Sequence, residues 1–231
     1  MTGIRPLPMM PGNRRKVVCR HGHARYIDPS WVSILADCGL APDADWSALS
    51  PGVRVSESKV TNCFRVDHPV AGSFYFKRYV YTRYKKLRYF MRPSKASNEV
   101  FGYRQLAELG IPTLEVVAFS EHRLFGRLVS ACVVTRGIDG SRDLETFARE
   151  EWSAMTSADR QQALQLIRET LFTQVRRAHA ANFFHQDLHW RNLLLVDDVD
   201  GGYRIHWIDC PRARYQRLRR NPPILADLAP P

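Results

Sequence analysis

The chain has 231 residues, 45% hydrophobic and 25% charged, which is the balance of a soluble globular protein with one large core or two small ones. Its formal net charge of +11 is unusual and indicates an anionic partner, such as a nucleotide, a nucleic acid, a phosphorylated glycolipid or an acidic membrane surface. No stretch approaches the roughly 20 apolar residues of a membrane-spanning helix, and the N-terminus lacks the apolar core of a signal peptide, so any membrane contact is expected to be peripheral. The five cysteines show no CxxC spacing, which favours a reducing, cytoplasmic setting.

The first half of the chain predicts a leader, a set of strands and one helix. Residues 1–30 are polar and basic and are expected to form a loosely packed leader. Alternating apolar patterns then predict three strands, around residues 53–55, 63–66 and 73–77. A helix is expected from about residue 94 to residue 109, because Gly110 follows directly and Pro112 lies just beyond.

The second half predicts two more strands, a long helix and a hairpin. The strands are expected at 114–119 and 128–135, followed by a connector punctuated by glycine. A capping-box pattern at Thr156-x-x-Asp159 predicts the start of the long helix. Its expected apolar face consists of Leu164, Ile167, Leu171, Val175 and Ala178. Two short strands should follow, at 193–196 and 203–208. The order indicates an α+β fold, with a β-rich first lobe over 31–137 and a short, α-rich second lobe over 138–231.

The most informative pattern is the segment His185–Asn192, with the sequence HQDLHWRN, followed by Asp209 after an apolar strand. Phosphoryl transfer from a nucleotide needs a carboxylate to receive the proton of the attacking hydroxyl, which would be Asp187. It also needs hard oxygen ligands for a metal ion, which Asn192 and Asp209 would supply. A single acid in a polar loop would mean little, but HxDxxxxN followed by two apolar residues and an Asp is a strong combination.

Lys77 ends the apolar run Phe74–Phe76, and a strand lysine at such a position can bind nucleotide phosphates. An edge-strand lysine on the surface is the plain alternative. Glu99 favours the functional interpretation, since it is the first carboxylate after Lys77 and falls within the predicted helix. A strand Lys paired with a helix Glu is the arrangement that kinases use to position phosphates.

The loop over the nucleotide should be residues 56–62. It contains no glycine, so the usual glycine-rich pattern is missing. Ser58, Thr61 and Asn62 are the candidates for hydrogen bonds to phosphates in this loop.

Two basic clusters are candidates for contact with the anionic partner, although a solvated charged face is the plain alternative for both. The first interleaves cations with aromatic residues and consists of Arg78, Arg83, Lys85, Lys86, Arg88, Arg92 and Lys95, with Tyr79, Tyr81, Tyr84, Tyr89 and Phe90 between them. The second follows Asp209 and consists of Arg212, Arg214, Arg217, Arg219 and Arg220. Such surfaces suit a phosphorylated glycan, a lipid headgroup layer or a single-stranded nucleic acid.

These motifs resemble the protein-kinase-like superfamily, and within it the lipopolysaccharide kinase family of Gram-negative bacteria (Kdo and heptose kinases). The segment HQDLH at His185–His189 is similar to the HxDLHxxN loop of these enzymes. The stretches Phe76–Tyr79, Arg92–Glu99 and Leu109–Thr113 are similar to the family's strand lysine, basic link, helix glutamate and LGIPT turn. Cys210-Pro211 departs from the usual pattern by replacing the Phe-Gly that follows the metal-binding Asp.

The resemblance implies a protein-kinase-like two-lobed fold that binds ATP and Mg²⁺. It implies Lys77 for phosphate binding with Glu99 as its partner, and Asp187 as the base. Asn192 and Asp209 would be the magnesium ligands. The hinge that holds the adenine through backbone groups would be Val134, Thr135 and Arg136, continuing to Ile138.

The expected function is therefore ATP-dependent phosphorylation of a sugar hydroxyl on the lipopolysaccharide inner core or a similar anionic glycolipid, at the cytoplasmic face of the inner membrane. A kinase of the same fold that acts on a protein or a small molecule is one alternative. A nucleotide-binding pseudokinase that serves as a scaffold is another. Nucleic-acid binding rests on charge alone, without a recognisable motif.

Overall fold

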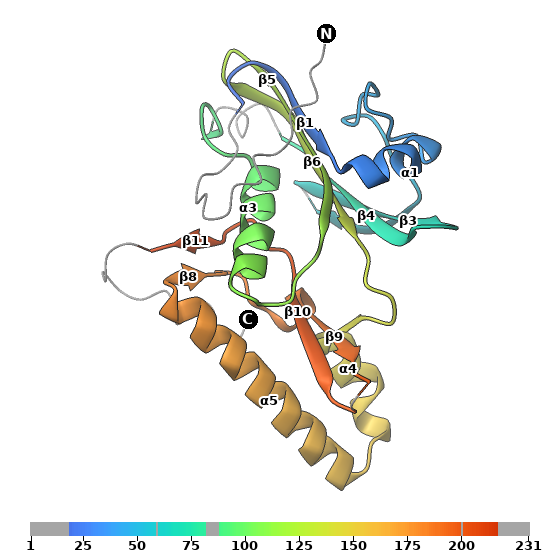
Figure 1. Cartoon of the computed structure of the whole chain (residues 1–231), viewed down its shortest axis with the longest axis vertical. Helices are drawn as coiled ribbons and strands as arrows, with labels where there is room; N and C mark the ends of the chain where they lie inside the picture. The colour runs from blue at the N-terminus through green and yellow to red at the C-terminus, as the bar shows by residue number, and fades with distance from the viewer. Residues whose placement is uncertain (1–18, 59, 82–87, 200, 217–231) are drawn as a thin grey trace. The chain divides into compact units, whose positions relative to one another are not determined.

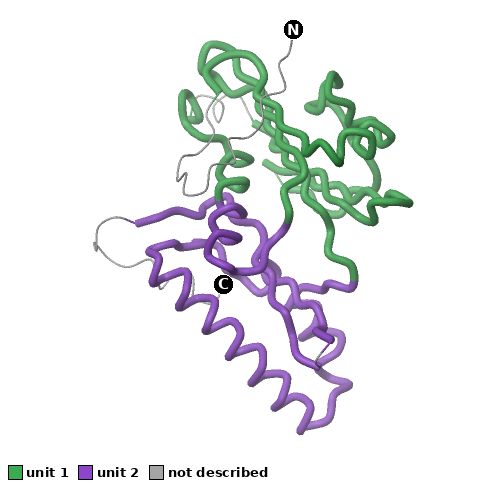
Figure 2. The backbone as a smooth tube through the Cα atoms, viewed as in Figure 1, with its two compact units in different colours: residues 1–101, 115–139 green, residues 102–114, 140–231 purple. Residues whose placement is uncertain are grey.

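The computed structural model describes residues 19–58, 60–81, 88–199 and 201–216. The chain divides into two compact units, shown in green and purple in Figure 2. Unit 1 comprises residues 1–101 and 115–139, and unit 2 comprises residues 102–114 and 140–231. Within the described ranges, no helix has the length and apolar character needed to cross a membrane.

Unit 1 is built on an antiparallel sheet, which has six strands within the described residues (Figure 1). In spatial order they are β1 (Gly22–Ile27), β5 (Val116–Leu124), β6 (Arg127–Arg136), β4 (Gly72–Tyr79), β3 (Thr61–His68) and β2 (Val53–Ser58). The strands expected from the period-two patterns are all present. The expectation of a loose leader is wrong for residues 22–27, because β1 pairs along its whole length with β5.

The two faces of this sheet carry separate apolar cores, because alternate side chains of a strand point to opposite faces. One face is covered by the turn η1 (Pro29–Trp31) and helix α1 (Val32–Asp37), where Trp31 and Leu35 pack against Phe74 and Phe76 of β4. The opposite face is covered by helix α3 (Lys95–Glu108), where Ala96 and Val100 pack with Tyr79, Ala131 and Val133. The predicted helix over about 94–109 is thus confirmed.

Within its described residues, unit 2 combines helices with a three-stranded sheet and a two-stranded sheet. Its elements are β7 (Arg142–Asp143), α4 (Leu144–Glu150), η2 (Trp152–Ala154), α5 (Ser157–Ala180), β8 (Phe183–Phe184), η3 (Trp190–Asn192), β9 (Leu193–Asp197), β10 (Tyr203–Trp207) and β11 (Arg214–Tyr215). The three-stranded sheet has the order β10-β9-β7, and the two-stranded sheet consists of β11 and β8. The predicted cap of the long helix is confirmed, because Thr156 Oγ1 accepts from the backbone N–H of Asp159 at 3.2 Å.

The C-terminal half of α5 holds the β9–β10 hairpin through a buried amide. Gln174 donates from Nε2 to the carbonyl oxygen of Ile205 at 2.9 Å and accepts from Trp207 Nε1 at 2.7 Å. Val175 and Ala178 are also buried, as the apolar pattern predicts. The expected face is wrong at the other end of the helix, where Leu164 is 45% exposed. A polar residue therefore makes the central contact on the face that period alone assigned to apolar residues.

Candidate active site

Lys77 and Glu99 meet within unit 1. Lys77 lies on β4, on the face of the sheet that α3 covers, and Glu99 lies on α3. The Lys77 Nζ atom is 3.1 Å from Glu99 Oε1, and the two side chains are 17% and 1% exposed. An ion pair this deeply buried is costly to form unless further hydrogen bonds satisfy the carboxylate.

Tyr79 supplies such a bond. Its hydroxyl, on a side chain only 2% exposed, donates to Glu99 Oε2 in a short hydrogen bond. Lys77 Nζ also lies 5.8 Å from the centre of the Tyr79 ring. Sequence reasoning assigned Tyr79 to the basic surface link and missed this role. The signal that could have found it is the two-residue spacing from Lys77, which puts both side chains on one face of the strand.

The expectation of a loop over 56–62 is wrong for most of its described residues, because 56–58 belong to β2, 61 and 62 belong to β3, and Ser58 pairs with Thr61. In this antiparallel register, Thr61 stands opposite Tyr79 and Asn62 stands opposite Arg78. Directly opposed residues share a face of the sheet, so Thr61 is on the Lys77 face and Asn62 is on the other. The side chain of Asn62 is thus separated from Lys77 by the sheet, whereas Thr61 is not.

The predicted hinge is the end of β6. The side chain of Val134 is fully buried in the α1-side core, whereas Thr135 shares the face of Lys77 and is 5% exposed. The backbone N–H of Arg136 donates to the carbonyl oxygen of Glu115, and that of Gly137 donates to Ser73, at 2.9 and 2.8 Å. Those two N–H groups are therefore already used by the fold.

The loop that carries Asp187 lies between β8 and η3 in unit 2. The Asp187 side chain is 21% exposed, and its Oδ1 lies 3.1 Å from His189 Nε2 and 4.0 Å from Arg212 Nη1. The imidazole donates to the carboxylate when Nε2 carries the proton. Both partners belong to patterns seen in the sequence, His189 to the loop motif and Arg212 to the second basic cluster, but their contact with Asp187 was not predicted.

Asn192 is anchored beside Asp187 and next to the start of β9. Its amide nitrogen Nδ2 donates to the carbonyl oxygen of Asp187 at 2.7 Å, and the residue is 4% exposed. This bond orients the amide, since only the other atom, Oδ1, can serve as an acceptor or a ligand. The β9–β10 pairing of Leu193 with Trp207 returns the chain to this point, and Ile208 N–H then donates to the carbonyl of Asn192 at 2.9 Å. The hairpin thus delivers Asp209 to the neighbourhood of Asn192, as the sequence predicted.

The backbone is strained next to Asp187 and at Asp209. Gln186 and Asp209 have φ values of 65° and 53°, in the left-handed region that is uncommon for residues other than glycine. Asp209 is held there from α3, because its N–H donates to the hydroxyl of Tyr103 at 3.2 Å. Strained conformations of this kind persist where surrounding contacts enforce them, and they cluster at active sites. Tyr103 is a positioning residue that sequence reasoning missed.

Gly102 of α3 explains how the chain after Asp209 comes so close to that helix. A Cβ at Gly102 would collide with the Sγ atom of Cys210, which is itself fully buried. Cys210, the first residue of the Cys-Pro that replaces the usual Phe-Gly, therefore packs directly on α3 at Gly102.

Comparison with known proteins identifies the family. The model of the lipopolysaccharide kinase (Kdo/WaaP) family matches residues 46–230. The chain belongs to the lipopolysaccharide kinase family. A solved structure described as WaaP in complex with acyl carrier protein is similar to the chain, with a TM-score of 0.65 and 20% sequence identity over 88% of this chain and 78% of that one. No curated protein sequence matches this chain. The predicted fold class and the assignment as a kinase are thereby confirmed.

The basic link predicted for this lipopolysaccharide kinase is partly a structural element. Arg78 donates to the carbonyl oxygens of Ser47 and Leu49, at 3.1 and 2.8 Å, while Tyr79 and Tyr81 are buried. The structure also describes Arg88 and Arg92 of the link, and Lys95 at the start of α3. The rest of the link (Arg83, Tyr84, Lys85 and Lys86) lies outside the described residues, as do Arg217, Arg219 and Arg220 of the second cluster.

The oxygen atoms of Asn192 and Asp209 fit a magnesium ion. The hydrogen bond from Nδ2 leaves the amide oxygen of Asn192 as the ligand atom, and Asp209 adds a carboxylate. Within the part of the chain that the structure describes, no group of three or more His, Cys, Asp and Glu side chains could hold a metal by itself. Two protein oxygens suit Mg²⁺, which keeps several waters and binds through one or two carboxylates together with substrate phosphates.

Proposed function

We propose that this lipopolysaccharide kinase transfers the γ-phosphoryl group of ATP to a sugar hydroxyl of a lipopolysaccharide inner core or a similar anionic glycolipid. We take unit 1 as its nucleotide-binding lobe and unit 2 as its catalytic lobe. Membership of the kinase family supports phosphoryl transfer. The single structural observation that carries the proposal is the anchoring of Asp187 and Asn192 to one another within the catalytic loop.

Asp187 would act as the base. Its carboxylate receives the proton of the acceptor hydroxyl as that oxygen attacks the γ-phosphorus, a contribution of about 10²- to 10⁴-fold for a well-placed general base. The contact with His189 at 3.1 Å supports this role, because it orients the carboxylate through Oδ1 and leaves Oδ2 for the hydroxyl. Arg212, whose Nη1 lies 4.0 Å from Oδ1, adds positive charge beside the place where an anionic acceptor would bind.

Lys77 and Glu99 would position the nucleotide phosphates. The ammonium group of Lys77 is held by a carboxylate whose second oxygen is bound by Tyr79, so its position is defined before a nucleotide arrives. Such preorganised charges stabilise the transition state because they need no rearrangement during the reaction. Ser58 and Thr61 would contact phosphates from the β2–β3 turn, and backbone groups at Val134–Arg136 would hold the adenine.

Asn192 and Asp209 would hold Mg²⁺. When bound, the ion neutralises charge on the phosphates of the nucleotide. The chain itself would fix the two ligands. The hydrogen bond from Asn192 Nδ2 to the carbonyl of Asp187 orients the Asn192 side chain, and the Tyr103 hydroxyl holds the backbone of Asp209.

The acceptor is proposed from charge and from the family. A net charge of +11 favours an acceptor that carries phosphates or carboxylates, as the lipopolysaccharide core does. A glycolipid acceptor places the kinase at the cytoplasmic face of the inner membrane as a peripheral protein. The similar solved structure is a complex with acyl carrier protein, which suggests that protein as a second partner to test.

The decisive experiment is phosphate transfer from γ-labelled ATP to purified lipopolysaccharide core with Mg²⁺, for the wild type and for Asp187→Asn. We expect transfer to fall by about 10²- to 10⁴-fold in the variant, with nucleotide affinity unchanged. Transfer at the wild-type rate by Asp187→Asn would refute the assigned base. Transfer only to a protein or a soluble sugar would replace the acceptor, and Mg²⁺-independent nucleotide binding without any turnover would favour a pseudokinase.

A further inference from the structure

Unit 1 carries an exposed apolar surface at the tip of the β5–β6 hairpin. Three chain segments form it: Cys19–Gly22, Arg88–Arg92 and Leu124–Arg127. Its apolar side chains are Phe125, Phe90, Leu124 and Met91, which are 82%, 48%, 47% and 42% exposed. We call this set of segments the hairpin-tip surface. Clustered apolar side chains left in water mark interaction sites more often than scattered single ones do.

Backbone hydrogen bonds join the three segments. Met91 N–H donates to the carbonyl oxygen of Gly126 at 3.1 Å, and Gly126 N–H donates to Arg20 at 2.8 Å. Phe125 N–H donates to His21 Nδ1 at 3.3 Å. A Cβ at Gly126 would lie 2.8 Å from Met91 Sδ and 3.0 Å from Phe90 Cε2, so the glycine is what lets these two side chains pack against the hairpin.

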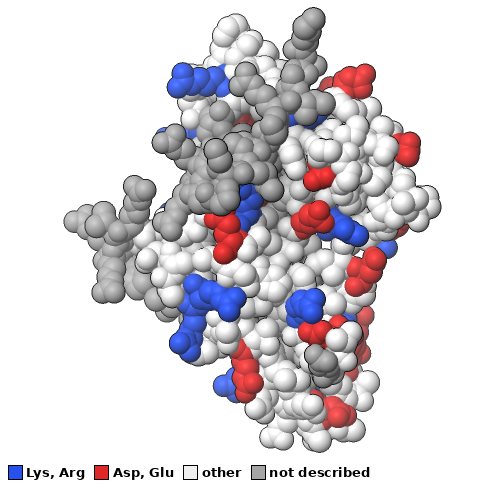
Figure 3. Space-filling view, in the orientation of Figure 1, with Lys and Arg blue, Asp and Glu red and all other residues white. Residues whose placement is uncertain are grey.

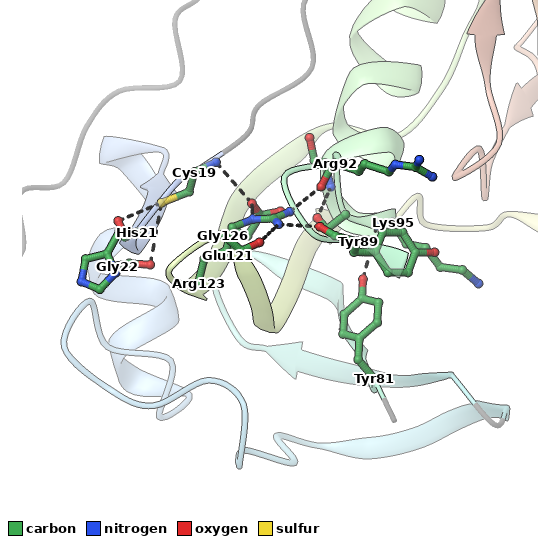
Figure 4. Close-up of polar contacts among 12 residues, drawn as sticks. Cys19, His21, Gly22, Tyr81, Tyr89, Arg92, Lys95, Glu121, Arg123 and Gly126 are labelled. Carbon is green, nitrogen blue, oxygen red and sulfur yellow. Dashed lines mark hydrogen bonds and ion pairs between the residues drawn. The ribbon is translucent and has the colours of Figure 1, made fainter. Parts of the chain in front are cut away.

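A buried ion pair fixes the surface from below (Figure 4). Arg123 and Glu121 are both 0% exposed, and Arg123 Nε lies 2.6 Å from Glu121 Oε1. The rest of the guanidinium group donates to the carbonyl oxygens of Tyr89, Gly126 and Arg92, at 2.8, 3.0 and 2.6 Å. Arg123 therefore ties the 88–92 segment to the hairpin tip. Burying an ion pair carries a free-energy penalty of desolvation. The protein therefore holds these loops in one arrangement at some loss of folding stability.

The two central apolar residues are also held in strained backbone conformations. Phe125 and Met91 have φ values of 47° and 52°. Phe125 and Gly126 form the two-residue turn closed by the pairing of Leu124 with Arg127, a position at which Asn, Asp or Gly is preferred. A phenylalanine there is both strained and exposed to water, so folding stability alone does not explain it. Strain of this kind points to a binding role.

The charges around the apolar residues are all positive. Arg20, Arg88, Arg92 and Arg127 are exposed. The three segments contain no Asp or Glu, and the nearby Glu121 is buried against Arg123. In Figure 3 most acidic side chains of the upper part of the visible face lie on the right, and Lys or Arg is visible at the upper left, where Figure 1 places the end of β5. The surface therefore complements an anionic partner.

We propose that the hairpin-tip surface docks unit 1 on an anionic phospholipid membrane. Phe125, Leu124, Phe90 and Met91 enter the headgroup region, while the arginines bind lipid phosphates. Apolar side chains flanked by cations are the combination that binds such membranes, because burial of apolar area adds to attraction by anionic lipids. This docking role rests on the proposed glycolipid acceptor, and it assigns a specific face of unit 1 to the membrane that holds the acceptor.

The test is co-sedimentation of the full-length chain with vesicles, without ATP or acceptor, so its result is independent of the proposed reaction. Vesicles of phosphatidylcholine containing about one third phosphatidylglycerol are compared with phosphatidylcholine alone. Phe125→Asn removes the apolar group and suits the left-handed turn, so its melting temperature should equal or exceed that of the wild type. We expect it to bind anionic vesicles about tenfold more weakly.

Two further variants separate the contributions. Phe172→Gln changes another exposed phenylalanine, 64% exposed on α5, and should bind like the wild type. Arg92→Gln combined with Arg127→Gln should weaken binding to anionic vesicles and reduce its sensitivity to salt. Unchanged vesicle binding by the folded Phe125→Asn variant overturns the proposal, as does equal binding of the wild type to both kinds of vesicle. Loss of binding to acyl carrier protein, with vesicle binding unaffected, would instead make the surface a protein interface.

Discussion

The backbone N–H of Ile208 donates to the carbonyl oxygen of Asn192 at 2.9 Å. This one bond continues the β9–β10 ladder past its last side-chain pair and brings the residue before Asp209 to the end of the catalytic loop. The ring of His185 adds a second connection, since its Nε2 lies 3.0 Å from the carbonyl oxygen of Ile208. Main-chain hydrogen bonds therefore bring the two proposed metal ligands together, and the side chains of His185 and Tyr103 add to their positioning.

Lys77→Met should remove the ammonium group proposed for the nucleotide phosphates and leave Glu99 as a buried carboxylate without that partner. We expect kcat/KM for ATP to fall by about 100-fold, the usual scale for losing one preorganised charge or donor. Steady-state kinetics with varied ATP would measure this. Arg54→Gln is a control that should keep wild-type kinetics, because Arg54 is exposed and stands opposite Phe64, on the face of the sheet away from Lys77. An equal loss in both variants would argue against a specific role for Lys77.

Tyr103→Phe should remove the hydroxyl that accepts the Asp209 N–H. The stability loss should be about 1 kcal/mol, typical of one hydrogen bond. If the hydroxyl positions Asp209 for the metal, the Mg²⁺ concentration for half-maximal activity should also rise. A purely structural role predicts a lower melting temperature with an unchanged Mg²⁺ profile, so titration of Mg²⁺ at saturating ATP distinguishes the two.

Gln174→Leu should destabilise unit 2, because it leaves Trp207 Nε1 and the carbonyl oxygen of Ile205 buried without their partner on α5. A buried polar group left unsatisfied costs about 1–3 kcal/mol. Urea unfolding should show this loss. Gln165→Leu, on the same helix but exposed, should have an effect within about 0.5 kcal/mol of zero.

The protein should lose stability as the pH falls below about 6.5. Burial of His206 lowers its pKa from the ordinary value of 6.5, and the same cause lowers the pKa of His122, reinforced by the neighbouring His23. A lowered folded-state pKa favours the neutral ring, so this stabilisation is complete above pH 6.5 and is lost as the pH falls towards the folded-state pKa values. Melting temperatures at pH 7.5 and 5.5 would measure it. His206→Gln should show a smaller drop than the wild type, and an equal drop would exclude His206 as a source.

Predictions from periodicity and caps succeeded where a local rule decides the outcome. The Thr156 cap and the strand carrying Lys77 follow from patterns within a few residues, and both are present. Predictions failed where a distant segment supplies the partner. Residues 22–27 look like a polar leader, yet they form β1, because β5 offers a free edge that the local sequence does not reveal.

By itself, the sequence determined the family and the identity of the chemical groups, because HxDxxxxN, the later Asp and the Lys–Glu pair are combinations of residue types that few other functions require. Only the tertiary structure decided which neighbours hold those groups. The hydroxyl of Tyr79 on Glu99, that of Tyr103 on the Asp209 backbone, and the separation of Asn62 from Lys77 by the sheet all depend on strand register and helix placement. Such contacts join residues distant in sequence, and the free energy that selects them comes from packing of the whole unit.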